Sequence, residues 1–162
     1  MNVLSILKKS IASFVIAFIL SSCAVTNFST TDTPATISEE FTREGLATWK
    51  GTIIIGFNNS YLKSSPMGTT YTVDPGPINI LVIYRESKGE IKIPAKFYDT
   101  YPITINAILK EGKSYQIKAS TNSNNVKFYI IDNSNNQVIA NSNETSIIYK
   151  SVDLPIESLI KK

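Results

Sequence analysis

The sequence has no histidine among its 162 residues and only one cysteine, Cys23. Without histidine the chain lacks the commonest general base, the commonest metal ligand and the base of a Ser-His-Asp or Cys-His arrangement. The single cysteine excludes an internal disulfide and a Cys-x-x-Cys motif. Neither a Gly-x-Ser-x-Gly segment nor a glycine-rich phosphate loop occurs. We therefore expect no catalytic residues, and a protein that is not an enzyme and whose fold depends on core packing.

Long apolar runs are also scarce. The run from Ile11 to Leu20 has ten residues with only Ser13 polar, and it follows Lys8 and Lys9. A transmembrane helix needs about 20 apolar residues, so this run is too short to span a bilayer. A basic segment followed by a short apolar segment is typical of an export signal peptide.

Leu20-Ser21-Ser22-Cys23 stands directly behind this run and resembles the lipobox of bacterial lipoproteins. The resemblance implies a signal peptide over residues 1–22, with Leu20, Ser21 and Ser22 recognised by the signal peptidase. It also implies cleavage before Cys23 and attachment of lipid, palmitate included, at that residue. An ordinary secretory signal peptide is the alternative.

Ala24 indicates where in the cell envelope a lipoprotein of this kind would be sorted. In the lipoprotein family, Ala24 rather than aspartate after the cysteine implies sorting to the outer membrane, so we expect a lipid-anchored protein facing the periplasm. Several acyl chains anchor a protein durably, because each buried methylene adds about 0.8 kcal/mol.

Without residues 1–22 the chain keeps 14 basic and 13 acidic residues, a net charge of +1. This balance argues against a nucleic-acid partner, which requires a clustered basic surface.

The remaining chain divides into three predicted parts. Residues 23–45 are rich in threonine and serine without an apolar period, which predicts a flexible tether behind the lipidated cysteine. Residues 46–152 are long enough for one domain with its own core. Residues 153–162 predict a short C-terminal helix, with Asp153 as its N-cap and Pro155 in its first turn.

From Trp49 onward, apolar and polar residues alternate with a period of two, which predicts strands. The predicted strand segments are 53–57, 68–73, 78–84, 91–97, 103–109, 115–119, 126–131, 138–140 and 147–149. The segment 78–84 is apolar at almost every position, which predicts a strand covered on both faces. Asp74-Pro75-Gly76-Pro77 predicts a turn with a positive φ at Gly76. About eight short strands without a helical period predict an all-β fold, a single antiparallel β-sandwich or small barrel.

Two turn segments are similar to hairpins of a group of small Gram-negative envelope lipoproteins with β-sandwich domains. They are Val73-Asp74-Pro75-Gly76-Pro77-Ile78-Asn79-Ile80 and Leu109-Lys110-Glu111-Gly112-Lys113-Ser114-Tyr115. The family usually has a polar residue where Pro77 and Ile78 stand. The resemblance implies a fold and an address, and it brings no catalytic residue.

The acidic residues offer one pattern that is similar to a metal site. Asp132-Asn133-Ser134-Asn135-Asn136 places oxygen atoms as the start of a calcium loop does, but the EF-hand glycine and the closing glutamate are missing. A turn is the favoured interpretation here and at Asp74, Asp99 and Asp153, because aspartate bonds its own backbone in turns. We therefore expect no metal and no cofactor.

The aromatic residues separate into two sets by their parity along the strands. Those on the inward parity are predicted to lie in the core: Tyr84, Phe97, Tyr115, Phe128 and Tyr149. Those in loops or on the outward parity form a candidate binding surface for glycan or peptide: Tyr61, Tyr98, Tyr101 and Tyr129. Scattered surface tyrosines without a ligand are the alternative.

Three functions compete at this point. The leading hypothesis is a non-catalytic, lipid-anchored envelope module that has a structural role or binds an envelope protein or peptidoglycan. The second is a periplasmic inhibitor of the lysozyme-inhibitor type, since Gly68-Thr69-Thr70-Tyr71 is similar to the "S-G-x-x-Y" loop of those proteins, with Met67 in place of the serine. The third is a hydrolase with two carboxylates facing one cleft.

Overall fold

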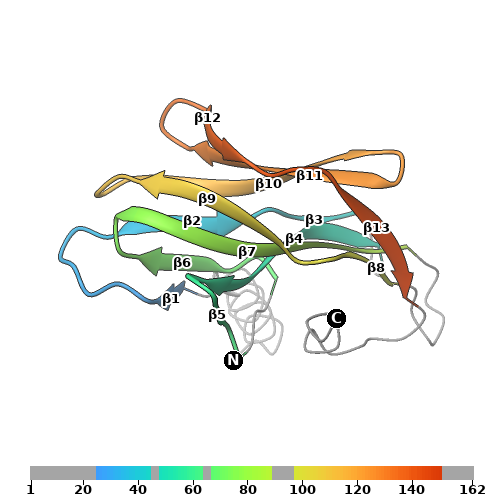
Figure 1. Ribbon diagram of the computed structural model, residues 1–162, viewed down its shortest axis with the longest axis horizontal. Helices are drawn as coiled ribbons and strands as arrows, with labels where there is room; N and C mark the ends of the chain where they lie inside the picture. The colour runs from blue at the N-terminus through green and yellow to red at the C-terminus, as the bar shows by residue number, and fades with distance from the viewer. Residues whose placement is uncertain (1–24, 45–47, 64–66, 89–96, 151–162) are drawn as a thin grey trace, which may run out of the picture.

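The computed structural model describes residues 25–44, 48–63, 67–88 and 97–150. Within these ranges the regular secondary structure is entirely β-strand, which confirms the predicted all-β class (Figure 1). The same ranges contain no helix with the length and apolar character needed to cross a bilayer. The predicted signal peptide 1–22, the lipobox with Cys23 and the C-terminal helix 153–162 lie outside the described residues.

The strands are β1 (Val25–Asn27), β2 (Ala35–Glu39), β3 (Phe41–Arg43), β4 (Trp49–Phe57), β5 (Ser60–Tyr61), β6 (Thr70–Val73), β7 (Gly76–Ser87), β8 (Phe97–Thr100), β9 (Ile103–Leu109), β10 (Ser114–Asn122), β11 (Asn125–Asp132), β12 (Gln137–Asn141) and β13 (Thr145–Lys150). Ten of them follow one path, in the order β1-β6-β2-β10-β11-β13-β8-β7-β4-β3. The other three pair beside this path, β12 with β11, β9 with β7 and β5 with β4.

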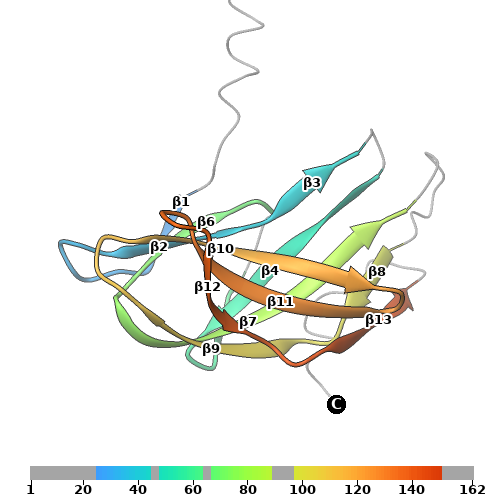
Figure 2. The same cartoon turned by 90° about the horizontal axis from the view of Figure 1, so that it is seen from above.

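The predicted sandwich or barrel takes the form of one strongly curled open sheet. β13 makes the curl, since its first two residues pair with β11 and its last four with β8. The half that contains β10 and β11 thereby lies over the half that contains β4 and β7 (Figures 1 and 2). The pairing is antiparallel except for β1 with β6 and β2 with β10, which are parallel and were not predicted.

The space between the two halves holds the main core. Its buried side chains come from both halves and are Ala35, Ile37, Ile54, Phe57, Tyr71, Val73, Ile78, Ile80, Val82, Tyr84, Ile105, Ala107, Leu109, Tyr115, Ile117, Val126, Phe128 and Ile130. β9 illustrates the rule, because its buried residues alternate with exposed ones along the whole strand. Tyr84, Tyr115 and Phe128 confirm their predicted core positions, while Phe97 is only half-buried.

The predicted tether over residues 23–45 needs correction, because the three strands β1, β2 and β3 lie within it. β2 fits between β6 and β10, and its inward residues are Ala35, Ile37 and Glu39. Its alternation escaped prediction because one inward position is small and another carries a carboxylate. The domain therefore begins some twenty residues earlier than the predicted boundary at residue 46.

Candidate functional site

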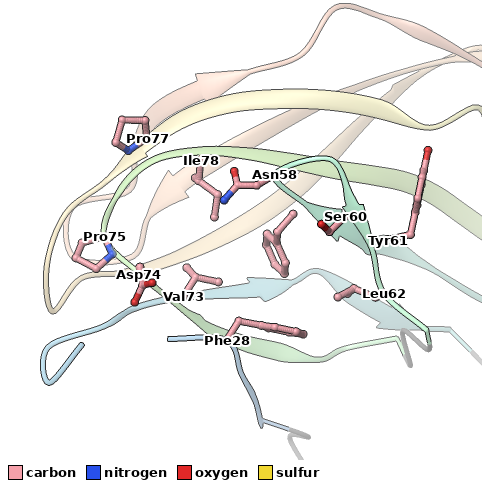
Figure 3. A pocket seen from close by; sticks show the side chains of 11 residues that line it. Phe28, Asn58, Ser60, Tyr61, Leu62, Val73, Asp74, Pro75, Pro77 and Ile78 are labelled. Atoms are coloured by element: carbon pink, nitrogen blue, oxygen red, sulfur yellow. The ribbon is translucent and has the colours of Figure 1, made fainter. Parts of the chain in front are cut away.

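A hollow of about 250 Å³ opens where β4 ends, beside β5 and the turn between β6 and β7. We call it the apolar hollow; its lining residues are Phe28, Phe57, Asn58, Ser60, Tyr61, Leu62, Val73, Asp74, Pro75, Pro77 and Ile78. Figure 3 shows Pro75 and Pro77 on one side of it and Tyr61 and Leu62 on the other. Residues from three separate parts of the sequence therefore meet at this end of the sheet.

Phe28 reaches the hollow because the chain directly after β1 is fixed to β6 and to the turn that follows. The Phe28 backbone N–H donates to the carbonyl of Thr72 at 2.7 Å. The Asp74 carboxylate accepts hydrogen bonds of 2.8 Å from the backbone N–H of Thr30 and from the hydroxyl of Ser29. The bonds from Thr30 and Ser29 hold the pKa of Asp74 below its usual value, because they stabilise the charged form.

The turn between β6 and β7 confirms one sequence prediction. Gly76 adopts a φ of 117°, so the glycine of Asp74-Pro75-Gly76-Pro77 supplies the positive φ that the turn requires. The two prolines on either side of that glycine line the hollow. The turn thus presents rigid apolar rings beside an aspartate whose oxygens are already hydrogen-bonded.

Phe28 and Phe57, which line the hollow, pack with the buried ring of Tyr71 behind them. The ring centroids of Phe28 and Phe57 lie 5.7 Å apart, those of Phe57 and Tyr71 5.4 Å, and those of Phe28 and Tyr71 6.1 Å. Tyr71 is buried and Phe57 is 9% exposed, whereas Phe28 is 46% exposed. Phe28 and the 49%-exposed Tyr61 therefore make a rim around a fixed aromatic floor.

Glu39 lies beneath this floor, with only 5% of the residue exposed. Its carboxylate accepts hydrogen bonds from the backbone N–H of Ile54 at 2.6 Å and of Thr69 at 3.1 Å. The hydroxyl of Tyr71 donates to the same carboxylate at 3.2 Å. A buried charge is tolerated where several donors stabilise it, so Glu39 ties β2 to β4 and to the start of β6.

A second, polar hollow of about 170 Å³ lies at the other end of β4. Its lining residues are Glu40, Thr42, Lys50, Gly51, Tyr84, Ala119 and Thr121. Glycine is required at position 51, since a Cβ there would collide with the backbone oxygen of Glu40. Glu40 is the only carboxylate among these lining residues, so this hollow does not assemble the carboxylate pair of the hydrolase hypothesis.

Charges around the polar hollow are paired with each other. The Lys50 ammonium lies 2.7 Å from the Glu44 carboxylate, whose hydrogen bond and charge raise the pKa of Lys50 above its usual value. The Tyr84 hydroxyl donates to the Glu86 carboxylate at 3.0 Å. Burial, and then the negative charge of Glu86, raise the pKa of Tyr84 well above its usual value.

The four tyrosines of the predicted binding surface lie on separate elements. Tyr61 on β5 lines the apolar hollow. Tyr98 on β8 and Tyr129 on β11 each lie beside a lysine ammonium, that of Lys88 at 5.0 Å and that of Lys127 at 5.7 Å. Tyr101 is 45% exposed in the connection between β8 and β9. Of the predicted tyrosine surface, only Tyr61 therefore belongs to the hollow.

Sequence reasoning missed the other walls of the hollow. Phe28 stands in the stretch predicted as a tether, and Phe57 is an ordinary strand end in the apolar pattern. The sequence pattern predicts only a turn for Pro75 and Pro77. Phe28 directly follows the short strand β1. Its place at the hollow depends on the parallel pairing of β1 with β6, which no local sequence pattern indicates.

The segment similar to a calcium loop forms a hairpin turn between β11 and β12. The Asp132 carboxylate accepts bonds from the backbone N–H of Ser134 at 2.8 Å and from its hydroxyl at 2.6 Å. These bonds, together with the positive charge of Lys113, lower the pKa of Asp132. Within the part of the chain that the structure describes, no three histidine, cysteine, aspartate or glutamate residues gather as metal ligands.

Asp99 corrects one turn assignment. It lies in the middle of β8, buried, and its two carboxylate oxygens each accept a 2.8 Å bond from the guanidinium of Arg85 on β7. Arg85 and Asp99 are directly paired across the two strands. Asp99 is therefore half of a bidentate ion pair and does not belong to a turn.

The segment that is similar to an inhibitor loop lies at the start of β6. Thr69 and Tyr71 are each 1% exposed, and both donate to the buried Glu39. Their side chains therefore face the interior, and an enzyme could not contact them without rearrangement. Thr69 and Tyr71 therefore offer no exposed side chain through which an inhibitor could contact an enzyme.

Leu20, Ser21, Ser22 and Cys23 lie outside the described residues. Comparisons with protein-family models, with curated proteins and with solved structures find no match to this chain.

Proposed function

We propose that the protein is a lipid-anchored module on the periplasmic face of the outer membrane that binds one apolar side chain of an envelope protein in the apolar hollow, without catalysing a reaction. The observation that carries this proposal is the hollow itself, with its exposed aromatic rim and its rigid proline wall. The lipobox supplies the anchor in this proposal, with the lipid on Cys23.

The position of the hollow in the chain supports this combination. Phe28 stands five residues after Cys23, and five residues extend over at most about 18 Å. β1 begins only two residues after that cysteine. A lipid at Cys23 would therefore hold the hollow close to the bilayer surface, where it meets membrane-associated partners.

The size and chemistry of the hollow favour an apolar side chain as its occupant. A cavity of about 150 Å³ lined by apolar residues accepts benzene, whereas drug-sized ligands occupy about 300 to 1,000 Å³. The volume of about 250 Å³ therefore suits one aromatic or large aliphatic group. Such an anchor, seated in an apolar pocket, supplies much of the affinity of many protein interfaces.

A sugar chain fits these walls less well. Its hydroxyls require several polar partners, and the polar side chains of the hollow are Asn58, Ser60, Tyr61 and Asp74. The Asn58 side-chain oxygen already accepts a bond from the backbone N–H of Asn79, and Asp74 bonds Ser29 and Thr30. Peptidoglycan is therefore the less favoured ligand.

Site-specific photocrosslinking in intact cells tests the binding part of the proposal. Benzoylphenylalanine is placed at position 61, on the rim, or at position 101, which is similarly exposed but outside the hollow. We expect protein adducts at position 61, mapped by mass spectrometry to a segment with a large apolar side chain, and none at position 101. Equal adducts at both positions, or adducts with glycan alone, would contradict the proposal.

The anchor requires its own measurement. We expect mass spectrometry of the membrane fraction to find acyl chains on Cys23, and Cys23→Ser to move the protein out of that fraction. An unmodified thiol in the exported protein would remove the anchor from the proposal, and the crosslinking result would still decide whether the hollow binds.

A further inference from the structure

β1 stands at one end of the curled sheet and has one unpaired side, which we call its free edge. Among the described residues β1 pairs with β6 alone, and Val25–Asn27 are all exposed. At the other end of the sheet, β5 pairs with the side of β4 that β7 leaves open, since both strands pair with the last residues of β4. Phe28 after β1 and Tyr61 on β5 both line the apolar hollow (Figure 3). The hollow therefore lies beside the free edge of β1.

The backbone groups of β1 point to its two sides in alternation. The Phe28 N–H donates to a carbonyl of β6 at 2.7 Å, so Phe28 and, by alternation, Thr26 direct their backbone groups at β6. Val25 and Asn27 direct theirs toward the free edge. The Ser29 N–H bonds the side-chain oxygen of Asn27, so the row stops there. Two residues thus present N–H and C=O groups to a further strand.

The free edge of β1 has no charged residue, proline or bulge, which are features that commonly prevent an edge from pairing with another chain. Two other strands that pair on one side differ, because β12 is bulged against β11 and β3 carries Arg43. β9 also lacks these features, but its residues line neither hollow. β1 therefore combines an open edge with a cavity, and its three residues limit the pairing to a short segment.

The side chains of an added strand would be in register with the hollow. Directly paired residues of neighbouring strands direct their side chains to the same face of the sheet. Phe28 directs its ring inward, against Phe57 and Tyr71. The residue opposite Phe28 on an added strand therefore also points inward, with its Cβ about 5 Å from that of Phe28. Its side chain then lies between the two rim residues, Phe28 and Tyr61.

We propose that the partner binds as an extended segment, which pairs with the free edge of β1 and inserts the side chain opposite Phe28 into the apolar hollow. This inference rests on the proposed function of the hollow and adds to it the conformation of the partner. Backbone hydrogen bonds supply affinity without sequence preference, and the hollow selects one large apolar side chain. Because neighbouring residues of the segment point away from the hollow, the partner requires an apolar residue at one position only.

Two probes separate the edge from the hollow in the full-length protein. N-acetyltryptophan amide offers the indole with little backbone, and a capped pentapeptide of threonine and valine carries tryptophan at its centre. We expect the pentapeptide to bind at least about tenfold more tightly. Its binding should also protect the Asn27 N–H from hydrogen exchange, measured by amide NMR.

The outcomes of this comparison distinguish the two proposals. Equal affinities without protection at Asn27 would overturn strand addition and leave the hollow as a binding site. Binding of neither probe would remove the proposed function, and strand addition with it. A dimer of the free protein in which Asn27 is already protected would identify a second copy of the chain as the occupant, which would overturn the inference.

Backbone methylation of the pentapeptide gives a test that changes no residue of the protein. N-methyl groups on alternate residues block one edge of the peptide, and the complementary set blocks the opposite edge. We expect one set to abolish the tenfold gain and the other to retain it, because only one edge of the peptide faces β1. Equal effects of the two sets would contradict strand addition.

Asn27→Pro and Asn27→Ala form a matched pair of protein variants. Both remove the oxygen that accepts the Ser29 N–H, but only proline also removes the backbone N–H at the free edge. Relative to Asn27→Ala, Asn27→Pro should bind the pentapeptide about tenfold more weakly. The two variants should bind N-acetyltryptophan amide alike, which shows that the hollow is intact. Equal binding of the pentapeptide by both variants would overturn the inference.

Discussion

The two hollows stand at opposite ends of β4 and differ in how their side chains are satisfied. Around the polar hollow, Lys50 pairs with Glu44 and Tyr84 bonds Glu86. At the apolar hollow, Phe28 and Tyr61 remain about half exposed on the rim. Charges that neutralise each other hold a structure together, whereas exposed aromatic side chains around a cavity leave area for a partner. The exposed aromatic rim is the difference between the two hollows that supports our proposal of recognition at the apolar one.

Glu39 and Glu40 are adjacent in the sequence, but Glu39 lies beneath the apolar hollow and Glu40 lines the polar one. Substitutions at these two positions should give the largest difference in the free energy of unfolding. Glu39→Leu leaves the buried N–H groups of Ile54 and Thr69 without their acceptor, and each such loss costs about 1 to 3 kcal/mol. We expect the free energy of unfolding to fall by at least about 3 kcal/mol in urea denaturation. Glu40→Gln, in the polar hollow, should cost about 1 kcal/mol or less. Equal costs would contradict the structural role of Glu39.

The second-largest difference in the free energy of unfolding should lie between the floor of the apolar hollow, at Phe57, and its rim, at Phe28. Phe57→Ala removes a ring that is 9% exposed, and we expect a loss of about 3 kcal/mol in the free energy of unfolding. Phe28→Ala removes a ring that is 46% exposed, so its cost should stay near 1 kcal/mol. The distinction between floor and rim would fail if Phe28→Ala were the more destabilising change in urea.

Alkaline pH should weaken the fold through the polar hollow. Because the pKa of Tyr84 is raised in the folded state, the folded chain keeps a proton that the unfolded chain loses above about pH 10. Stability from this group is complete below that pH and is lost as the pH rises further, by at most about 1.4 kcal/mol per pH unit. Urea denaturation from pH 9 to pH 11.5 should show this slope.

Two tyrosine variants locate the source of the alkaline slope. Tyr84→Phe should reduce it, because the titrating phenol is gone. Tyr61→Phe, which changes the exposed tyrosine of the other hollow, should leave the slope unchanged. An identical slope in wild type and Tyr84→Phe would show that other groups carry the alkaline dependence.

The smallest effect is expected at the edge of the apolar hollow. Asp74→Asn weakens the bonds that hold Ser29 and Thr30, so the Thr30 amide should exchange with solvent faster while the Tm stays nearly unchanged. Since the pKa of Asp74 is lowered, the same loosening should occur in the wild type as the pH falls below about 4. Asp132→Asn, at the distant hairpin, is the control and should not alter exchange at Thr30.

The strands after Trp49 could be predicted because apolar residues alternate along them, as Ile103, Ile105, Ala107 and Leu109 do in β9. β2 could not, since its third inward residue is Glu39, and donors from β4, from Thr69 and from β6 help to make that burial tolerable. Asp99 was misjudged for a similar reason, because its partner Arg85 stands fourteen residues away on another strand.

The candidate site was harder to predict than the fold. Tyr61 is identifiable as a surface aromatic, but the hollow depends on the parallel pairing of β1 with β6, which brings Phe28 beside Phe57. A contact between residues 29 positions apart leaves no periodic signal in a single sequence. Local patterns therefore predicted the strands and turns, and the site came from their pairing.

The most direct test is a titration of the full-length protein with indole, followed by amide NMR shifts. We predict saturable binding with a Kd of about 1 mM or tighter and shifts confined to residues 28, 57–62 and 73–78. Tyr61→Ala should weaken the binding, whereas Tyr101→Ala, at a similarly exposed tyrosine, should not. Shifts around Glu40, Lys50 and Tyr84, or none that saturate, would contradict the assignment of recognition to the apolar hollow.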